Sequence, residues 1–509
     1  MLQINNLSII HKKDLSKIIE NFSFVLNSGD KVVIIGEEGN GKSTLLKMIA
    51  DENLVESYTE HSGEIIIQNE SIGYLPQWLP EAYKSKTLYE YYSHMPQFFE
   101  LSPGEQSELT KQLGLTPDFL YSDQIMDTLS GGEKIKAQFI GLLIKKPSLL
   151  LLDEPSNDID IETLEWMEDF INLSPIPIMF VSHDEMLIER TATVVIHIER
   201  LRRKTIPRCT VAHMPYKQYI QERLSRFEHQ EQLARKEKSD FDKKMEKYRQ
   251  LESKVEHQQN TVSRQDPHGG QLLKKKMHAV KSMGRRFERE KEGMTQLPEY
   301  ESSILLKFTG TAEIPKGKTV LDLSLDTLAV DGRQLSKDIH LFVQGGEKIC
   351  IIGRNGAGKT TLVRIIADIL LPRKDMNVCY MPQNYEDEMS SDITPVDFLS
   401  STGHKDEITQ IRTWMASMKF TADEMGHPIS ELSSGQKAKL FFLKTNLDGA
   451  NVLILDEPTR NFSPLSNPVI RDVLKEYAGT IISVSHDRRY ISEVCSKVYE
   501  LTPKGLVIK

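Results

Sequence analysis

Two stretches of this chain have the residue types and order of a nucleotide-phosphate site. Each is a glycine-rich loop that ends in a lysine and a hydroxyl residue, at 36–43 and 353–360. Glycines let backbone N–H groups curve around a phosphate, and the lysine reaches the outer phosphates. The residues predicted to hold nucleotide here are Gly36, Gly39, Gly41, Lys42, Ser43 and Thr44, and in the second loop Gly353, Gly356, Gly358, Lys359, Thr360 and Thr361.

The same further elements follow each loop in the same order. They are a glutamine in a Tyr-Leu-Pro-Gln or Tyr-Met-Pro-Gln turn, a Leu-Ser stretch, an acidic pair and a histidine after Val-Ser. The same 303 residues separate Leu129 from Leu432, Glu154 from Glu457 and His183 from His486. A constant offset across three elements indicates an internal duplication. The further residues predicted to contact nucleotide are Gln77, Ser130, Gly131, Gly132, Gln383, Ser433, Ser434 and Gly435.

The acidic pairs supply the catalytic chemistry. Each ends a four-residue apolar run, so each carboxylate pair is expected at the end of a buried strand. The aspartate is expected to hold Mg²⁺, and the glutamate to polarise an attacking water, typically worth about 10²–10⁴ in rate. The predicted metal residues are Ser43, Gln77, Asp153, Thr360, Gln383 and Asp456. The predicted catalytic residues are Glu154, Glu457, His183 and His486, the histidines as hydrogen-bond partners of the terminal phosphate.

Composition narrows the class of protein. A chain of 509 residues predicts about three domains, and 39% hydrophobic with 27% charged residues is typical of a soluble globular protein. No apolar run approaches the roughly 20 residues of a membrane helix, and the N-terminus lacks the pattern of a signal peptide. Four scattered cysteines fit a reducing compartment. We therefore expect a cytoplasmic protein with no membrane partner.

The elements that position these residues repeat as well. Apolar strands at 31–35 and 348–352 run into the glycine loops, and further buried strands precede each acidic pair and each histidine. We expect an α/β fold in which each half is a parallel, helix-flanked sheet with an antiparallel β-portion and a helical insert. The predicted domains are 1–205, a linker at 206–300, and 301–509.

The linker is predicted to form an α-helical hairpin. Its first helix, at about 218–258, carries a coiled-coil-like apolar stripe of Ile220, Leu224, Phe227, Phe241, Met245, Tyr248 and Val255. Turn-forming residues follow at 265–270. The second helix, at about 271–292, presents Leu273, Met277, Val280, Gly284 and Phe287 on one face. The tip is expected near 260–272.

One end of this hairpin is strongly basic, although the whole chain has a net charge of −9. Against the single acidic residue Asp266, this segment holds Arg264, Lys274, Lys275, Lys276, Lys281, Arg285 and Arg286. A charge run is often only a solvated helix face. A concentrated positive tip on an acidic chain is better explained by a polyanion such as RNA or DNA.

The combined pattern resembles the ATP-binding cassette superfamily, whose hallmark is the Leu-Ser-Gly-Gly-Glu stretch at 129–133. Two cassettes joined by a charged helical linker resemble its ABC-F family. The resemblance implies two ATP-binding cassette domains that pack head to tail around two ATP–Mg²⁺ molecules. Ser433 would then face Lys42, and Ser130 would face Lys359. The family implies an ATPase that acts as a monomer.

The resemblance also implies a partner. ABC-F proteins bind the ribosome near the tRNA exit site and reach the peptidyl-transferase region through the linker, where 23S-type rRNA and tRNA are the contacts. Some family members serve routine translation, and others protect ribosomes from antibiotics. The long hairpin, and the lack of room for an extra arm between Lys42 and Gln77 or between Lys359 and Gln383, favour ribosomal protection.

The second copy departs from the family pattern in two places. Ser434 replaces a glycine, and Arg460-Asn-Phe-Ser463 lacks the final aspartate present as Asp160 in the first copy. Both changes fall in the site built on Lys42, so we expect the Lys359 site to be better formed. The usual adenine-stacking aromatic before each loop is replaced by residues 9–11 and 328–330, so we expect apolar contact or His11 to hold the base.

Three other classes of protein remain open. An energy-coupling ATPase of a membrane transporter also has two cassettes, but it leaves the basic hairpin unexplained. A DNA-maintenance ATPase carries coiled coils, usually longer and inserted within one cassette. An ATP-gated binding module would not require both Glu154 and Glu457.

Overall fold

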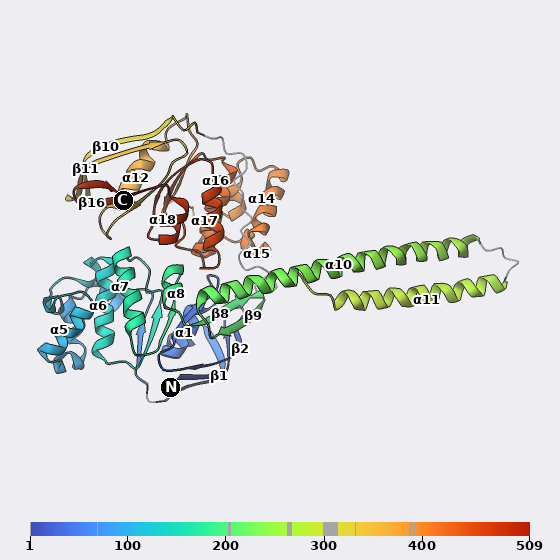
Figure 1. The fold of residues 1–509 in the computed structure, drawn as a ribbon, viewed down its shortest axis with the longest axis horizontal. Coiled ribbons are helices and arrows are strands. Elements are labelled where there is room, and N and C mark those ends of the chain that lie inside the picture. Colours follow the sequence, from blue (N-terminus) through green and yellow to red (C-terminus); the bar gives the residue numbers. More distant parts are fainter. Residues whose placement is uncertain are drawn as a thin grey trace. The chain divides into compact units, whose positions relative to one another are not determined.

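The structure is a computed structural model that describes residues 2–68, 70–201, 205–261, 267–298, 314–330, 332–385, 389 and 392–509. Contacts divide the chain into two compact units. The first joins Met1–Tyr216 with Glu301–Lys509, and the second is Lys217–Tyr300. The first unit thus contains both copies of the duplicated sequence, and the second is the helical linker (Figure 1).

In the described part of the first copy, the largest sheet has six strands in the order β5-β6-β7-β3-β8-β9. All neighbours are parallel except β9, which pairs antiparallel with β8. The strands are β3 Lys31–Ile35, β5 Ile72–Leu75, β6 Leu149–Asp153, β7 Ile178–Val181, β8 Val194–Arg200 and β9 Ile206–Ala212. The sheet therefore continues past the boundary expected at 205.

The second copy has the same topology. Its described strands follow the order β13-β14-β15-β12-β16-β17, again parallel except for the last pair. They are β12 Lys348–Ile352, β13 Val378–Met381, β14 Val452–Asp456, β15 Thr480–Val484, β16 Lys497–Thr502 and β17 Gly505–Ile508. The predicted α/β duplication is confirmed.

The sheet topology explains why distant residues meet. Strands β6 and β14 are buried at every position, as expected for continuous apolar runs inside a helix-covered parallel sheet. Because β3, β6 and β7 run in the same direction, the glycine loop, the acidic pair and the histidine all follow the same edge of the sheet. Such edges are where open α/β sheets bind ligands.

Antiparallel strands and helices complete each copy. The antiparallel strands are β1 Leu2–His11, β2 Lys17–Leu26, β4 Thr59–Ile67, β10 Thr319–Val330 and β11 Arg333–Gln344. The helices of the first copy are α1 Lys42–Ala50, α2 Asn53–Glu56, α3 Glu81–Lys84, α4 Leu88–Ser93, α5 Pro103–Gln112, α6 Gly131–Ile144, α7 Ile161–Leu173 and α8 Glu185–Thr191. Those of the second are α12 Lys359–Leu370, α13 Pro395–Leu399, α14 Lys405–Ser417, α15 Ala422–Gly426, α16 Ser434–Leu447, α17 Asn467–Glu476 and α18 Arg488–Val494.

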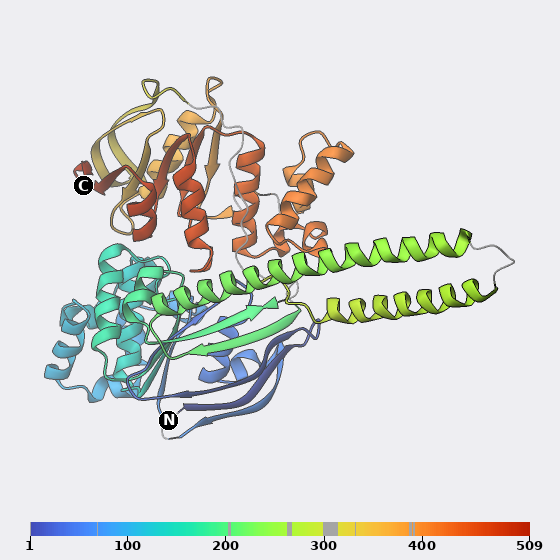
Figure 2. The same ribbon diagram turned by 45° about the vertical axis from the view of Figure 1, so that its right-hand side comes forward.

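The linker forms the predicted pair of helices, α10 Tyr216–Thr261 and α11 Pro267–Glu292, which run side by side in both views (Figures 1 and 2). Phe287 packs edge-on against Phe241 and Tyr248, with ring centroids 6.3 Å and 5.8 Å apart. The Tyr248 hydroxyl lies 2.7 Å from where a Cβ on Gly284 would stand, so a larger residue there would have to displace the Tyr248 side chain. The apolar stripe therefore forms the seam of a helical hairpin.

The linker differs from expectation in one residue of the apolar stripe and in the start of its second helix. Leu224 is 52% exposed and contributes little to a buried seam. Helix α11 begins at Pro267, before the predicted start near 271. On its exposed faces lie Lys274, Lys275, Lys276, Lys281, Arg285 and Arg286. Arg264, the remaining predicted basic contact, lies outside the described residues. Searched over the described chain, no helix combines the length and apolar character that crossing a membrane requires.

Candidate nucleotide sites between the two copies

The two glycine loops have the same backbone geometry. Gly36 and Gly353 have φ of 149° and 151°, and a Cβ there would lie 2.3 Å from the Ile198 carbonyl oxygen and 2.8 Å from that of Leu501. Glycine is thus required at both positions by the close approach of the neighbouring strand. In the second loop, the Lys359 side chain folds back over the loop backbone. Its Nζ donates to the carbonyls of Gly353 and Arg354 at 2.9 Å and 3.0 Å.

Each loop leads directly into the N-terminus of a helix. Gly41 and Gly358 are the N-cap residues of α1 and α12, both in the left-handed conformation and without a side-chain cap. Glycine at the N-cap leaves the first N–H groups of each helix available to an anion. The loop and helix together have the geometry of a phosphate cradle, as the sequence predicts.

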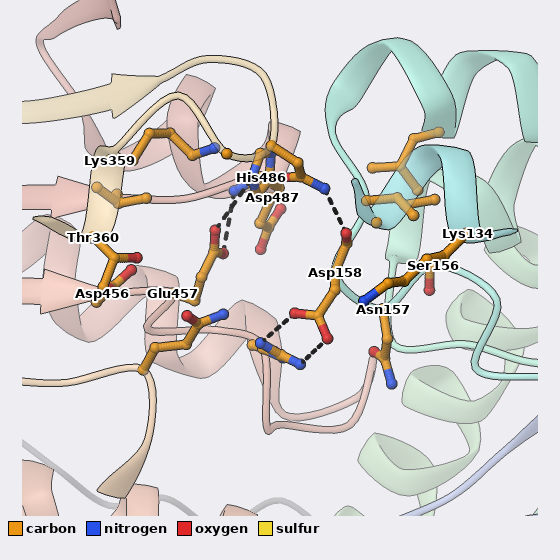
Figure 3. A pocket seen from close by; sticks show the side chains of 18 of the residues that line it. Lys134, Ser156, Asn157, Asp158, Lys359, Thr360, Asp456, Glu457, His486 and Asp487 are labelled. Atoms are coloured by element: carbon orange, nitrogen blue, oxygen red, sulfur yellow. Dashed lines mark hydrogen bonds and ion pairs between the residues drawn. The ribbon is translucent and has the colours of Figure 1, made fainter. Parts of the chain in front are cut away.

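A cavity of about 1130 Å³ surrounds Lys359 and is lined by residues from both copies. Figure 3 shows Lys359, Thr360, Asp456 and Glu457 on one side, with Asp158 on the other. Of the predicted residues, the cavity gathers Gly356, Gly358, Lys359, Thr360, Thr361, Gln383, Asp456, Glu457 and His486 from the second copy, with Gly131 and His183 from the first. Two copies of one fold thus build a shared site here.

The cavity around Lys42 is smaller, about 470 Å³, and its lining comes from the first copy. It gathers the predicted residues Gly39, Gly41, Lys42, Ser43, Thr44, Gln77, Glu154 and His183. The other predicted nucleotide residues, Gly36, Gly132, Gly353, Ser130, Ser433, Ser434 and Gly435, line neither cavity. The unequal linings agree with the expectation that the Lys359 site is better formed.

The two glutamates predicted to be catalytic occupy strained positions. Glu154 and Glu457 have φ of 51° and 55°, a left-handed conformation that is uncommon outside glycine. Their N–H groups donate to Val181 and Val484 on the adjacent strand at 3.0 Å and 2.9 Å. Such strain is typically maintained at functional sites. Its repetition in both copies supports the same role for both residues.

The two glutamates meet their histidines differently. Nε2 of His183 lies 2.9 Å from Glu154, and its Nδ1 lies 2.7 Å from the carbonyl oxygen of Phe462 in the second copy. Nε2 of His486 is 3.7 Å from Glu457, and its buried Nδ1 has no hydrogen-bond partner among the described residues. Only His183 is therefore tied across the seam between the copies.

This difference alters the charge state of the two sites. Burial would raise the pKa of Glu154, but His183 and Lys42 hold it below its ordinary value. Burial and the neighbouring Asp456 raise the pKa of Glu457 to about 8, and burial with Lys359 lowers that of His486 to about 3. Glu154 is therefore ionised at neutral pH, whereas Glu457 is largely protonated beside a neutral His486.

The aspartates fit a role in holding Mg²⁺. Both carboxylate oxygens of Asp456 are buried, and among the described residues neither meets a donor at full hydrogen-bond geometry. In the first copy the Ser43 hydroxyl donates to Asp153 at 2.8 Å. Burial raises the pKa of both aspartates, and a cation would offset this cost. Described residues form no cluster of three His, Cys, Asp or Glu that could hold a metal. Mg²⁺ would therefore need hydroxyl and nucleotide oxygens as well.

The Leu-Ser stretches form helix N-termini that face the other copy. Ser130 and Ser433 are the N-caps of α6 and α16, each in a capping box with the residue three positions later. A Cβ on Gly131 would lie 1.8 Å from the Asp158 carbonyl oxygen and 2.9 Å from Asn355 of the second copy. Ser434 occupies the matching position in α16. Because serine has a Cβ, the backbone that faces it must run differently from the one that faces Gly131.

The first-copy segment that contains Asp158 and Asp160 makes the contacts between the two copies at the Lys359 site. Arg460 pairs with both carboxylate oxygens of Asp158 at 2.8 Å and 2.9 Å. The Asn355 side chain donates to the Asp158 carbonyl, and its N–H lies 3.5 Å from Asp160. Asp160 also caps α7 through Thr163. The first copy's loop thus binds the second copy's glycine loop directly.

Sequence patterns missed several residues of the sites. Tyr58 and Arg200 line the Lys42 cavity beside His11, with the His11 and Tyr58 rings 6.3 Å apart. Leu335 lines the Lys359 cavity beside Val330, which belongs to the stretch 328–330 expected to contact the base. These side chains come from elements that carry no repeated motif, so no spacing in the sequence indicates them. An aromatic ring at the first site thus follows the glycine loop instead of preceding it.

A buried ionic cluster joining the copies was also missed. Arg471 makes a two-bond contact with Glu185 at 2.7 Å and 3.1 Å, and it bonds Glu493 at 2.7 Å. Arg488 reaches Glu168 and Asp184, and Arg489 reaches Glu185 and Glu189. The first copy supplies carboxylates to this cluster, and the second copy supplies the arginines. The acidic Glu185 and the basic Arg488, for example, occupy matching positions of the duplication.

Comparison with known proteins supports the resemblance to the ATP-binding cassette superfamily. The family model described as ABC transporter matches residues 19–157 and 336–460, together more than half of the chain. The putative ATP-binding protein YdiF of Bacillus subtilis is 27% identical, over 99% of this chain and 80% of that protein. ABC transporter F family member 5 of Arabidopsis thaliana is also 27% identical, over 78% of this chain and 54% of that protein.

Solved structures share the fold. The archaeal ribosome recycling factor aABCE1, solved with the ribosomal stalk protein aP1, superposes with a TM-score of 0.59 at 17% identity. The match covers 97% of this chain and 87% of that one. A structure of RNase-L Inhibitor gives a TM-score of 0.58, also at 17% identity, over 98% and 89%. With two matched cassettes and F-family relatives, this chain belongs to the ABC transporter family, and within it to the ABC-F group of ATP-binding proteins.

Proposed function

We propose that the protein is an ATPase of the ABC-F type that acts on the ribosome as a translation factor. The observation that carries the proposal is the Lys359 cavity. There the phosphate loop and acidic pair of the second copy face Gly131 and Asp158 of the first copy. A nucleotide bound there contacts both copies, so its binding favours the closed arrangement and its hydrolysis releases it.

In this proposal the residues of one site divide the work. Lys359 and the N–H groups around Gly358 hold the phosphates. Glu457, ionised when a cation at Asp456 offsets its raised pKa, takes a proton from the attacking water. Thr360, Gln383 and Asp456 would hold Mg²⁺, which supplies charge neutralisation at the phosphates. Lys42, Ser43, Gln77, Asp153 and Glu154 have the same roles at the first site. His183 and His486 orient the terminal phosphate.

The basic segment of the hairpin supplies the RNA contact. Its six described basic side chains, Lys274, Lys275, Lys276, Lys281, Arg285 and Arg286, are all exposed, and no ion pair within the described chain joins them to a carboxylate. Exposed, unpaired cations on one helix suit the phosphates of rRNA or tRNA. The solved aABCE1 complex with a ribosomal stalk protein, and the structure of ribosome-bound archaeal Pelota and ABCE1, support a ribosomal partner.

The finer proposal is binding near the tRNA exit site, with the hairpin tip acting on the peptidyl-transferase region. We propose that this protects the ribosome from antibiotics, in a cytoplasmic, monomeric protein. Its first cassette would extend beyond 205 through β9 Ile206–Ala212, followed by the helical linker up to 300 and a second cassette at 301–509. Growth of a deletion strain on ribosome-targeting antibiotics tests this part. Increased sensitivity to at least one class is expected, and unchanged sensitivity to every class removes the protection role.

The central test is the double variant Glu154→Gln with Glu457→Gln. It should bind ATP without hydrolysing it, and therefore co-sediment with ribosomes in ATP more than in ADP. The matched control is Lys42→Ala with Lys359→Ala, which should lose the nucleotide dependence. Sedimentation that ignores nucleotide, or membrane association in its place, would favour the transporter-subunit alternative.

The RNA contact is tested separately by reversing Lys274, Lys275 and Lys276 to glutamate. Ribosome binding should fall strongly, while ATP hydrolysis by the free protein stays within about twofold because these residues lie outside both cavities. The matched control reverses the exposed Lys236, Lys238 and Lys243 on α10. Equal loss in both triple variants would mean that overall charge, not this segment, decides binding.

A further inference from the structure

The third residue of each glycine loop reaches across to the other copy, but the two loops differ there in charge. The first loop reads Gly36-Glu37-Glu38, and the second reads Gly353-Arg354-Asn355. Glu38 contacts the N-terminal turn of α16, and Asn355 contacts the segment beside the N-terminus of α6. A carboxylate thus stands at one seam where a neutral amide stands at the other.

The carboxylate of Glu38 binds a helix N-terminus. The Gly435 N–H in the first turn of α16 donates to Glu38 Oε2 at 2.5 Å. A Cβ on Gly435 would lie 2.9 Å from that oxygen and 2.7 Å from the Asn461 carbonyl, so the approach depends on glycine. Negative charge is favoured at a helix N-terminus, and hydrogen bonds to a carboxylate are stronger than neutral ones.

Helix α16 has no acidic residue of its own in its first turn. Helix α6, its counterpart, carries Glu133 there, and Glu133 bonds the capping Ser130. The matching position in α16 holds the neutral Gln436, which accepts from the N–H of the capping Ser433. The first turn of α16 therefore receives its anion from Glu38 of the opposite copy.

The opposite loop offers no such charge. Asn355 donates its side-chain amide to the Asp158 carbonyl, and its Nδ2 lies 2.9 Å from where a Cβ on Gly131 would stand. Asn355 and Gly131 both line the larger cavity around Lys359, whereas the smaller cavity around Lys42 is lined from the first copy. The two cavities that differ in lining therefore also differ at the third loop position, which is Glu38 in the first copy and Asn355 in the second.

We propose that Glu38 competes with the terminal phosphate of ATP for the N-terminus of α16. The carboxylate closes the Lys42 site onto the second copy without nucleotide, and ATP must displace it. The inference rests on the proposed function in taking ATP as the ligand. It makes the Lys42 site the weaker ATP site. ADP, which lacks the terminal phosphate, does not meet this competition.

The test measures ATP and ADP affinity by calorimetry with Mg²⁺ present, in full-length protein that carries Glu154→Gln and Glu457→Gln. Lys359→Ala leaves the Lys42 site as the one measured. Against this background, Glu38→Asn and Glu38→Gln should each tighten ATP binding about fivefold and leave ADP within about twofold. Glu38 is exposed, so neither substitution removes buried packing.

The reciprocal variant gives the proposal a second readout. In the Lys42→Ala background, Asn355→Glu should weaken ATP binding at the Lys359 site by a similar factor without weakening ADP. Equal effects on ATP and ADP, or no effect of either Glu38 variant, would overturn the competition. If the backgrounds themselves bind no ATP, the proposed ATP sites fail first, which separates that failure from a failure of Glu38.

Discussion

Arg471 of α17 and Glu185 of α8 form a two-bond ion pair between the duplicated copies, with side chains only 2% and 5% exposed. These residues lie outside both nucleotide cavities. The contact therefore joins the copies independently of nucleotide, and it adds to the seam that the sites create. Burial raises the pKa of Glu185 although Arg471 opposes the rise, which shows how far the pair is removed from water.

Removing one member of this pair should be costly. Arg471→Ala leaves the buried Glu185 with only the longer 3.3 Å contact to Arg489, and it is expected to lower the free energy of unfolding by about 3–5 kcal/mol. Urea unfolding followed by intrinsic fluorescence measures the loss. Arg354→Ala, which breaks the exposed pair with Glu162, should cost less than about 1 kcal/mol. Similar losses in both variants would mean that the buried pair contributes no more than a surface one.

The two proposed ATP sites should contribute unequally to turnover. Lys359→Ala removes the lysine proposed to bind phosphate in the cavity lined by both copies, so steady-state phosphate release should fall about 100-fold. Lys42→Ala acts at the smaller cavity and should lower it by less than about tenfold. Phosphate release at saturating ATP measures both, and the reverse ranking would contradict the assignment of the better-formed site.

Asp160 should couple helix capping to the Lys359 site. Its carboxylate accepts from the Thr163 N–H at 3.0 Å and lies 3.5 Å from the Asn355 N–H. Asp160→Ala is expected to cost about 1 kcal/mol of stability through the lost cap and also to lower ATP turnover. Asp160→Asn, which keeps a capping oxygen, should retain most of the stability. Ser463→Ala at the matching position is the control, and an equal fall in turnover there would contradict the role.

Lys31 should make stability depend on alkaline pH. Its Nζ donates to the carbonyls of Ser174 and Ile176 at 2.8 Å, and burial lowers its pKa from 10.5 to about 8. The folded state then binds this proton less tightly than the unfolded state, so stability should rise between about pH 8 and 10.5. Thermal unfolding across that range should show a flatter slope for Lys31→Met than for the parent. The exposed Lys504→Met should keep the parent slope.

The sequence alone predicts most of each cassette. Gly36, Lys42 and their counterparts recur with fixed spacing because a phosphate loop requires short-range geometry, and buried parallel strands require continuous apolar runs such as 149–152. The helical hairpin follows from apolar spacing in the same way, since its seam is formed by neighbours along each helix. Local chemistry and local periodicity are written directly in the order of residues.

What only the tertiary structure decides is how side chains from separate elements meet. Tyr58 and Arg200 reach the Lys42 cavity, and Arg471 finds Glu185, through packing that no repeat or spacing encodes. The charge states of Glu154 and Glu457 also diverge there, although the sequence presents them as equivalents. Burial and the distance to the nearest opposite charge set these properties, and both are defined only once the chain has folded.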